Sequence, residues 1–122
     1  MAKILVIDDD ELVRSTVAAA LEHAKHEVVQ ASDGQEGVNT FQGGKFDLVV
    51  TDIIMPEKEG IETIIEIRQR DPQVKIIAIS GGGRTSNQIF LDVAKKFGAV
   101  DVLPKPFTPK QLVTMVQQVL AG

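Results

Sequence analysis

Short, continuous hydrophobic runs alternate along this chain with longer segments in which apolar residues recur three and four positions apart. The runs are rich in Val and Ile and predict β-strands at residues 3–7, 27–31, 47–51, 75–79 and 100–103. The longer segments predict helices at about 10–24, 34–43, 58–70, 85–97 and 109–121. Their strict alternation predicts an α/β fold, a doubly wound five-stranded parallel sheet with helices on both faces.

Helix-capping signals support two of these boundaries. Asp33 is followed three positions later by Glu36, which resembles a capping box at the start of the second helix. Thr108 precedes Pro109 and Gln111, so the fifth helix has a cap, a proline in its first turn and a partner for a capping box. Both signals stand where the hydrophobic spacing becomes helical.

The composition of the runs also indicates the order of the strands. Runs 4–7, 48–51 and 76–79 are the most uniformly apolar, as expected of central strands covered on both faces. Runs 27–31 and 100–103 fit the edges because they contain polar residues, namely Glu27, Gln30 and Asp101. With the first strand beside the third, the order is 2-1-3-4-5, as in flavodoxin-like (βα)5 folds. Ligands bind such sheets at the switch point, which here lies between the first and third strands.

Charged groups stand at the ends of three of the predicted strands. Asp8 and Asp9 follow the first strand, Asp52 the third, and Lys105 the fifth. The carboxyl ends of parallel strands open at one edge of the sheet, so these groups are expected to meet in a shallow pocket. Three carboxylates beside one ammonium group predict a site for a divalent metal ion and a phosphoryl group.

The composition limits the classes of protein to consider. With 122 residues, 43% of them hydrophobic, the chain is expected to form one domain over residues 1–122 with no output domain. It has no cysteine, which excludes disulfides and a thiolate metal site and fits a reducing cytoplasm. A net charge of −4 argues against direct nucleic-acid binding, and no apolar run is long enough to span a membrane. We therefore expect a cytoplasmic protein.

The three consecutive acids Asp8, Asp9 and Asp10 have two possible explanations. An aspartate before a helix can cap it, and Asp10 is placed for that role. Adjacent carboxylates repel one another, however, so such a cluster is costly unless a cation neutralises it or one group keeps its proton. Mg²⁺ prefers oxygen ligands and keeps several waters, and a Mg²⁺ site is the favoured explanation over capping alone.

Asp52, Ser80 and Lys105 each have a simpler alternative role. They could be a turn aspartate, a turn hydroxyl and a solvated surface lysine, respectively. Beside the metal carboxylates, Asp52 could instead be both a ligand and a nucleophile that forms an acyl phosphate. Ser80 would then hydrogen-bond the phosphoryl group, and Lys105 would bind it as a point charge. Pro104 and Pro106 restrict the backbone around Lys105, and a cis bond before Pro106 could direct the ammonium group inward.

On these residues, the sequence resembles the receiver domain of two-component response regulators over essentially its whole length. The matching pieces follow one another at suitable spacing and are Ile7-Asp8-Asp9, Asp52-Ile53-Ile54-Met55-Pro56, Ser80 and Lys105-Pro106-Phe107. The resemblance implies a phosphoacceptor switch whose strand order is the one given above. It further implies that Asp52 ligates the metal and accepts a phosphoryl group from the phosphohistidine of a histidine kinase or phosphotransfer protein.

The resemblance implies roles for the remaining site residues as well. Asp8 and Asp9 would hold Mg²⁺, and the main-chain carbonyl of Ile54 would complete the protein's share of the metal ligands. Ser80 and Lys105 would contact the phosphoryl group. The protein would not be an enzyme in its own right, beyond assisting its own phosphoryl transfer and autodephosphorylation.

Output in this family usually passes through the face formed by the fourth helix, the fifth strand and the fifth helix, where a downstream protein would bind. Family members often have an aromatic residue on the fifth strand that turns inward on activation. Val102 stands at that position here, so this chain departs from the usual aromatic switch.

His23 and His26 lie near the end of the first predicted helix. They are favoured as partners of the helix dipole, ahead of a phosphodonor or metal pair.

Two other functions remain as alternatives. The first is a phosphohydrolase resembling the haloacid dehalogenase group, with Asp8 as nucleophile, Asp10 as general acid, and Ser80 and Lys105 in support. No acidic pair follows Lys105, and the chain has no room for a substrate-capping domain, which disfavours this enzyme. The second alternative is a degenerate receiver that only binds partners.

Overall fold

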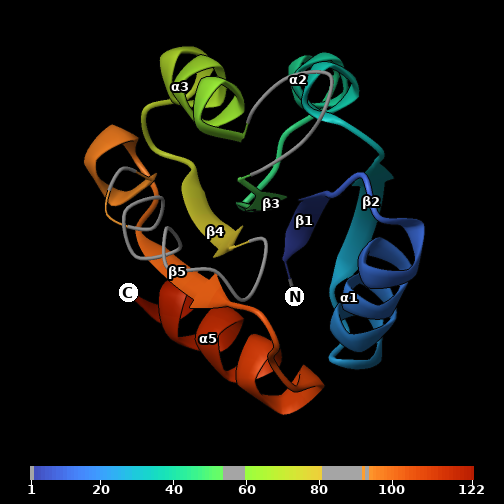
Figure 1. Cartoon of the computed structure of the whole chain (residues 1–122). Coiled ribbons are helices and arrows are strands. Elements are labelled where there is room, and N and C mark those ends of the chain that lie inside the picture. The colour runs from blue at the N-terminus through green and yellow to red at the C-terminus, as the bar shows by residue number, and fades with distance from the viewer. Residues whose placement is uncertain (1, 54–59, 81–91, 93) are drawn as a thin grey trace.

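The structure is a computed structural model that describes residues 2–53, 60–80, 92 and 94–122. Strands and helices alternate along the chain (Figure 1), in the order β1 (Lys3–Ile7), α1 (Glu11–His23), β2 (Glu27–Ala31), α2 (Gly34–Gln42), β3 (Leu48–Asp52), α3 (Gly60–Arg70), β4 (Lys75–Ser80), β5 (Asp101–Pro104) and α5 (Pro109–Ala121). The predicted boundaries of these elements agree to within two residues. The helix predicted at 85–97 lies largely outside the described residues, although residues 94–97 are helical.

The five strands form one sheet in the order β2-β1-β3-β4-β5, and every neighbouring pair is parallel. This confirms the predicted fold class and strand order. The central strands β1 and β3 are buried almost throughout, whereas β2 exposes Glu27 and Gln30 at one edge. In the pairing of β1 with β3, Ile7 lies opposite Thr51, so β3 ends one residue beyond the end of β1.

Helices cover both faces of the sheet, with α2 and α3 on one side and α1 and α5 on the other (Figure 1). Because side chains alternate along a strand, each central strand supplies both hydrophobic cores. The core under α2 and α3 includes Leu5, Ile7, Val49, Phe41, Ile64 and Ile67. The core under α1 and α5 includes Ile4, Val6, Val50, Leu21, Leu112 and Val116. Both cores are mainly aliphatic.

The predicted caps differ in how far they form. At the start of α5, Thr108 and Gln111 form the complete capping box. At α2, the Asp33 side chain accepts a hydrogen bond from the main-chain N–H of Glu36 at 2.8 Å, as predicted. The reciprocal bond is different, because the Glu36 carboxylate accepts from the main-chain N–H and the hydroxyl of Ser32 instead. In a capping box, the Glu36 carboxylate would accept from the main-chain N–H of Asp33. Here its donors belong to the preceding residue, Ser32.

Arg68, in the last turn of α3, joins three segments at the amino edge of the sheet, where the strands begin. Its guanidinium group donates hydrogen bonds to the main-chain carbonyls of Pro72 at 2.8 Å, Val74 at 2.5 Å and Gly98 at 2.6 Å. Gly98 has a φ of 135°, which favours glycine, and an added Cβ there would lie 3.0 Å from Arg68 Nε. This arginine therefore pairs with three main-chain carbonyls in the turns that lead into β4 and β5.

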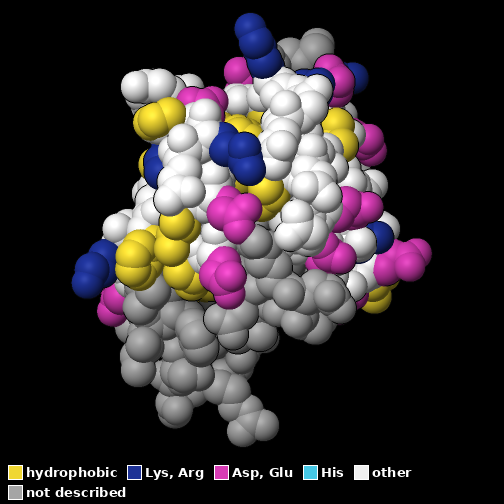
Figure 2. Space-filling view, turned by 90° about the horizontal axis from the view of Figure 1, so that it is seen from above, with side chains coloured by type: hydrophobic (Ala, Val, Ile, Leu, Met, Phe, Trp, Pro, Cys, Tyr) yellow, Lys and Arg dark blue, Asp and Glu magenta, His cyan; other side chains and the backbone are white. Residues whose placement is uncertain are grey.

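The surface on the side of α2 and α3 has no dominant charge among the described residues. Figure 2, seen from above relative to Figure 1, shows acidic and basic side chains interspersed there, with small groups of hydrophobic side chains between them. Among the residues that the structure describes, no helix is both long and apolar enough to cross a membrane.

Candidate functional site

Three carboxylates meet at the carboxyl edge of the sheet. Asp8 and Asp9 follow β1, and Asp52 is the last residue of β3. Because β1 and β3 pair in register, one ligand oxygen from each of the three acids lies within 4.8 Å of the others. The structure thus brings together the acids that the sequence predicted to meet.

The acids of this cluster differ in their contact with solvent. Asp8 and Asp52 are only 1% and 4% exposed, whereas Asp9 is exposed. Asp8 Oδ1 accepts a hydrogen bond from the main-chain N–H of Asp10 at 2.9 Å, but the buried Oδ2 accepts none from the described residues. Burial raises the pKa of Asp8, the Asp10 N–H and Lys105 oppose that shift, and Asp9 adds to it. An ionised Asp8 is therefore costly unless another cation approaches it.

The Lys105 ammonium group lies close to both buried acids, Asp8 and Asp52. Its Nζ is 3.6 Å from Asp8 Oδ2 and 3.6 Å from Asp52 Oδ2, and its side chain is about one-fifth exposed. The bond between Lys105 and Pro106 is cis, as considered from the sequence. Among the described residues, one ammonium group lies beside these three carboxylates, and it can balance only one of their negative charges if all three are ionised.

The donor set fits a hard divalent cation. It consists of carboxylate oxygens, one of them a buried oxygen without a hydrogen bond from the described residues. The exposed Asp9 leaves one side of the cluster open to water, and Mg²⁺ retains several water ligands in protein sites. Asp8, Asp9 and Asp52 are therefore the residues that could hold Mg²⁺.

Two predicted site groups lie outside what the structure describes. The main chain of Ser80 ends β4 opposite Pro104, but its side chain is not described. Ile54, whose carbonyl is the further expected metal ligand, is also outside the described residues. The roles of Ser80 and Ile54 stay predictions.

Asp10 has the capping role that the sequence indicated. Its Oδ1 accepts hydrogen bonds from the main-chain N–H groups of Leu12 at 3.0 Å and Val13 at 3.2 Å. The third acid of the run therefore satisfies the first turn of α1, while Asp8 and Asp9 belong to the carboxylate cluster.

Arg14 is a site neighbour that the sequence analysis missed. Its Nη1 donates a hydrogen bond to the main-chain carbonyl of Asp8 at 2.8 Å, and its Nε donates to Gln30 Oε1 at 3.2 Å. The only signal in the sequence was a cationic residue in the helix directly after the acidic run, and cationic residues are common on helix surfaces.

His26 was considered with His23 as a possible phosphodonor or metal pair. Its Nδ1 instead accepts a hydrogen bond from the main-chain N–H of Ala2 at 3.1 Å.

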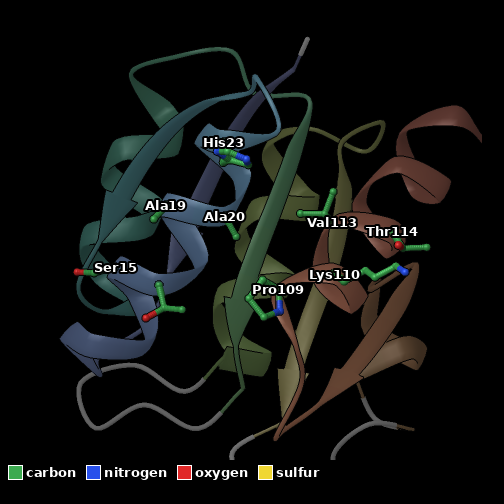
Figure 3. A pocket seen from close by; sticks show the side chains of 9 residues that line it. Ser15, Ala19, Ala20, His23, Pro109, Lys110, Val113 and Thr114 are labelled. Atoms are coloured by element: carbon green, nitrogen blue, oxygen red, sulfur yellow. The ribbon is translucent and has the colours of Figure 1, made fainter.

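Apolar surface extends from the carboxylate cluster along α1. Leu12 is 77% exposed and lines a hollow of about 340 Å³ together with Lys105 and Phe107. A second hollow of about 730 Å³ lies between α1 and α5 (Figure 3), and its lining residues are Ser15, Thr16, Ala19, Ala20, His23, Pro109, Lys110, Val113 and Thr114. Thr16 lines both hollows, so the two lie next to each other along α1.

The profile of the response regulator receiver domain matches residues 4–117 of this chain, which carry the fold and the carboxylate cluster. The chain belongs to the response regulator receiver family. This receiver domain is 36% identical over 118 residues to the chemotaxis protein CheY of Thermotoga maritima, covering 96% of both chains. It is also 36% identical over 121 residues to the sensor kinase CckA of Brucella abortus, covering 98% of this chain but 12% of that protein.

Solved structures agree with the sequence relationship. The chemotaxis protein CheY4 of Vibrio cholerae superposes with a TM-score of 0.87 at 30% identity, covering 98% of both chains. A receiver domain from Clostridium thermocellum superposes with a TM-score of 0.90 at 32% identity, covering 99% of this chain and 95% of that one. Several curated relatives are much longer, since the chain spans only 24% of the regulator NtrC of Azospirillum brasilense and 48% of PhoP of Bacillus subtilis.

Proposed function

We propose that this receiver domain takes a phosphoryl group onto Asp52 and so switches its contacts with other proteins. The observation that carries the proposal is the position of Lys105 Nζ, 3.6 Å from the nearest oxygens of both Asp8 and Asp52. An ammonium group there can neutralise charge on a phosphoryl group bound to Asp52. Histidine kinases and downstream effectors are the partners with which receiver domains work.

The transfer requires little covalent chemistry from the protein. A carboxylate oxygen of Asp52 forms a bond to phosphorus as the bond between phosphorus and the donor imidazole nitrogen breaks. The imidazole leaves with the electron pair of that bond and takes a proton from solvent. Lys105 stabilises the negative charge on the moving phosphoryl oxygens, and Ser80 donates a hydrogen bond to the product.

Asp8 and Asp9 hold the metal in this proposal. Mg²⁺, when bound by Asp8, Asp9, Asp52 and the Ile54 carbonyl, supplies positive charge to the phosphoryl oxygens. Asp8 is poorly suited as the nucleophile, because burial raises its pKa and its Oδ1 accepts the Asp10 N–H bond. Asp10 caps α1, which disfavours it as the general acid of a haloacid dehalogenase-like phosphohydrolase.

Mapping the modified residue tests the proposed function. After incubation with acetyl phosphate and Mg²⁺, mass spectrometry should locate the phosphoryl group on Asp52, and Asp52→Asn should lower uptake at least about a hundredfold. Asp47→Asn at the amino edge is the control and should take up phosphate like the unmodified protein. An adduct on Asp8 with turnover of phosphate esters would establish the phosphohydrolase instead.

We infer that the phosphodonor docks over the first turn of α1 and the chain after β5. Leu12, 77% exposed, and the half-buried Phe107 line a hollow together with Lys105, whose Nζ lies 3.6 Å from Asp8 and Asp52. A histidine kinase or phosphotransfer protein must bring its phosphohistidine to this edge, and exposed apolar side chains suit a protein partner. Leu12→Asp should therefore slow transfer from a protein donor but leave uptake from acetyl phosphate unchanged.

For the output, the face of the fourth helix, β5 and α5 remains our proposal. Phe97, in the helical residues 94–97, is 42% exposed, and Val100, directly before β5, is 50% exposed. Val102 is half-buried and packs against the core under α2 and α3, in place of the aromatic residue common in the family. A downstream protein that binds here would detect changes in these apolar contacts.

A further inference from the structure

Arg14 is linked to the acidic segment through the main chain. It lies in the second turn of α1, is half-buried, and donates from Nη1 to the carbonyl oxygen of Asp8 at 2.8 Å. Its Nε donates to Gln30 Oε1 at 3.2 Å, so the neighbouring strand β2 orients the guanidinium group. The contact therefore joins α1, the end of β1 and β2 directly beside the carboxylate cluster.

The carbonyl that Arg14 holds belongs to the peptide group between Asp8 and Asp9. Other contacts fix the neighbouring atoms, since the Asp8 N–H donates to the Ala31 carbonyl at 3.2 Å and Asp8 Oδ1 accepts from Asp10 N–H. Asp9 is exposed, so packing does not fix its position, and its backbone must do so. A charge-assisted hydrogen bond to the preceding carbonyl is a direct means of holding that peptide plane.

We propose that Arg14 is a positioning residue for the divalent metal, because it fixes the peptide that places the Asp9 carboxylate beside Asp8 and Asp52. The proposal rests on the proposed function, since it assumes that these acids bind Mg²⁺. Arg14 would act through the Asp8 carbonyl rather than as a ligand of the metal. Groups that orient metal ligands typically change affinity by about 10- to 100-fold when removed.

Titration with Mg²⁺ by calorimetry tests this role. Arg14→Met keeps the length of the side chain but removes its donors, and should weaken Mg²⁺ binding about tenfold. Arg14→Lys keeps a charge and a donor but loses the fork, so its affinity should lie between the two. At saturating Mg²⁺, the rate of phosphoryl uptake from acetyl phosphate should recover in both variants, because Asp52 and Lys105 are unchanged.

Arg68→Met is the matched control. Arg68 also donates to main-chain carbonyls, but at the opposite edge of the sheet. Its loss should lower stability while the folded protein binds Mg²⁺ with unchanged affinity. Circular dichroism establishes that each variant is folded before titration. Equal Mg²⁺ affinity for Arg14→Met and the unmodified protein, or equal weakening by Arg68→Met, would overturn the proposal.

The same experiments distinguish the positioning role of Arg14 from the phosphorylation of Asp52. If Arg14→Met weakens Mg²⁺ binding but the phosphoryl group appears on Asp8, the positioning role stands and the assignment of Asp52 fails. If Asp52 is phosphorylated and Arg14→Met binds Mg²⁺ normally, only the positioning role fails. A native protein that binds no Mg²⁺ at all contradicts both.

Discussion

Charged side chains have different surroundings at the amino edge and at the carboxyl edge of the sheet. At the amino edge, charged side chains are matched to main-chain groups: Arg68 donates to three carbonyls, Lys75 Nζ donates to the Val119 carbonyl at 2.7 Å, and Asp47 accepts from the Lys3 N–H at 2.8 Å. At the carboxyl edge, three carboxylates crowd within 4.8 Å of one another. At the first edge these charged groups pair with the main chain, whereas at the second edge like charges lie close together, and a cation can relieve their repulsion.

This difference separates a structural from a functional use of charge. Pairing a side chain with an otherwise unsatisfied backbone group is a common way to stabilise a fold. Placing like charges together lowers stability, and proteins retain such sites where function needs them. The carboxyl edge is therefore the part of the molecule where loss of charge should increase stability.

The largest expected effect on folding is at the amino edge. Arg68→Met leaves three main-chain carbonyls without their donor and should lower the free energy of unfolding by about 3 kcal/mol, measured by urea denaturation. Arg70→Met, on the exposed side of the same turn, is the control and should change stability little. Similar losses in the two variants would remove the distinction between the two edges.

A substitution at the carboxyl edge should have the opposite sign. Without Mg²⁺, Asp8→Asn should raise the free energy of unfolding at neutral pH by about 1 kcal/mol, because it removes a buried charge and keeps an acceptor for the Asp10 N–H. The exposed Asp9 provides the comparison, since Asp9→Asn should stabilise less. A clear loss of stability in Asp8→Asn would contradict the interpretation.

The pH dependence follows from the same carboxylate. Burial raises the pKa of Asp8 above that in the unfolded chain, so the folded protein binds more protons between the two pKa values. Its contribution to stability is therefore present below the unfolded pKa of about 3.9 and is lost as pH rises through the folded pKa. Mg²⁺ should reduce this loss. Urea denaturation across pH, with Asp8→Asn as the reference, measures the contribution.

The smallest expected effect lies near the beginning of β1. Burial lowers the pKa of His26, whose Nδ1 accepts the Ala2 N–H bond only when it is unprotonated. Its contribution to stability is present above the unfolded pKa of about 6.5 and is lost as pH falls through the folded value. An NMR titration should place the His26 pKa below that of a free histidine. A higher value would rule out the neutral acceptor at this edge.

The sequence predicted the fold well because burial in a parallel sheet leaves a direct pattern. Strands β1 and β3 are covered on both faces and are therefore continuously apolar, and the acids at their ends, Asp8, Asp9 and Asp52, meet as expected. Lys105 also lies where it was predicted, since it directly follows β5. Strand order and site position were thus consequences of the same hydrophobic pattern.

Contacts to the main chain could not be predicted in the same way. Arg14 and Arg68 both resemble surface arginines in the sequence, because their acceptors are carbonyls that every residue has. The Glu36 carboxylate similarly bonds Ser32 where the capping rule placed the cap residue's own main chain. Such partners depend on where the loops lie, which hydrophobic spacing does not determine.

The pairing of β1 with β3 has one further consequence for the dimensions of the metal site. Neighbouring strands lie about 4.8 Å apart, and the acids of this site are anchored at the ends of two such strands, with Ile7 opposite Thr51. Backbone hydrogen bonds between these strands therefore set the distance between Asp8 and Asp52. Repacking of the aliphatic interior that leaves this register intact should preserve the spacing of the ligands.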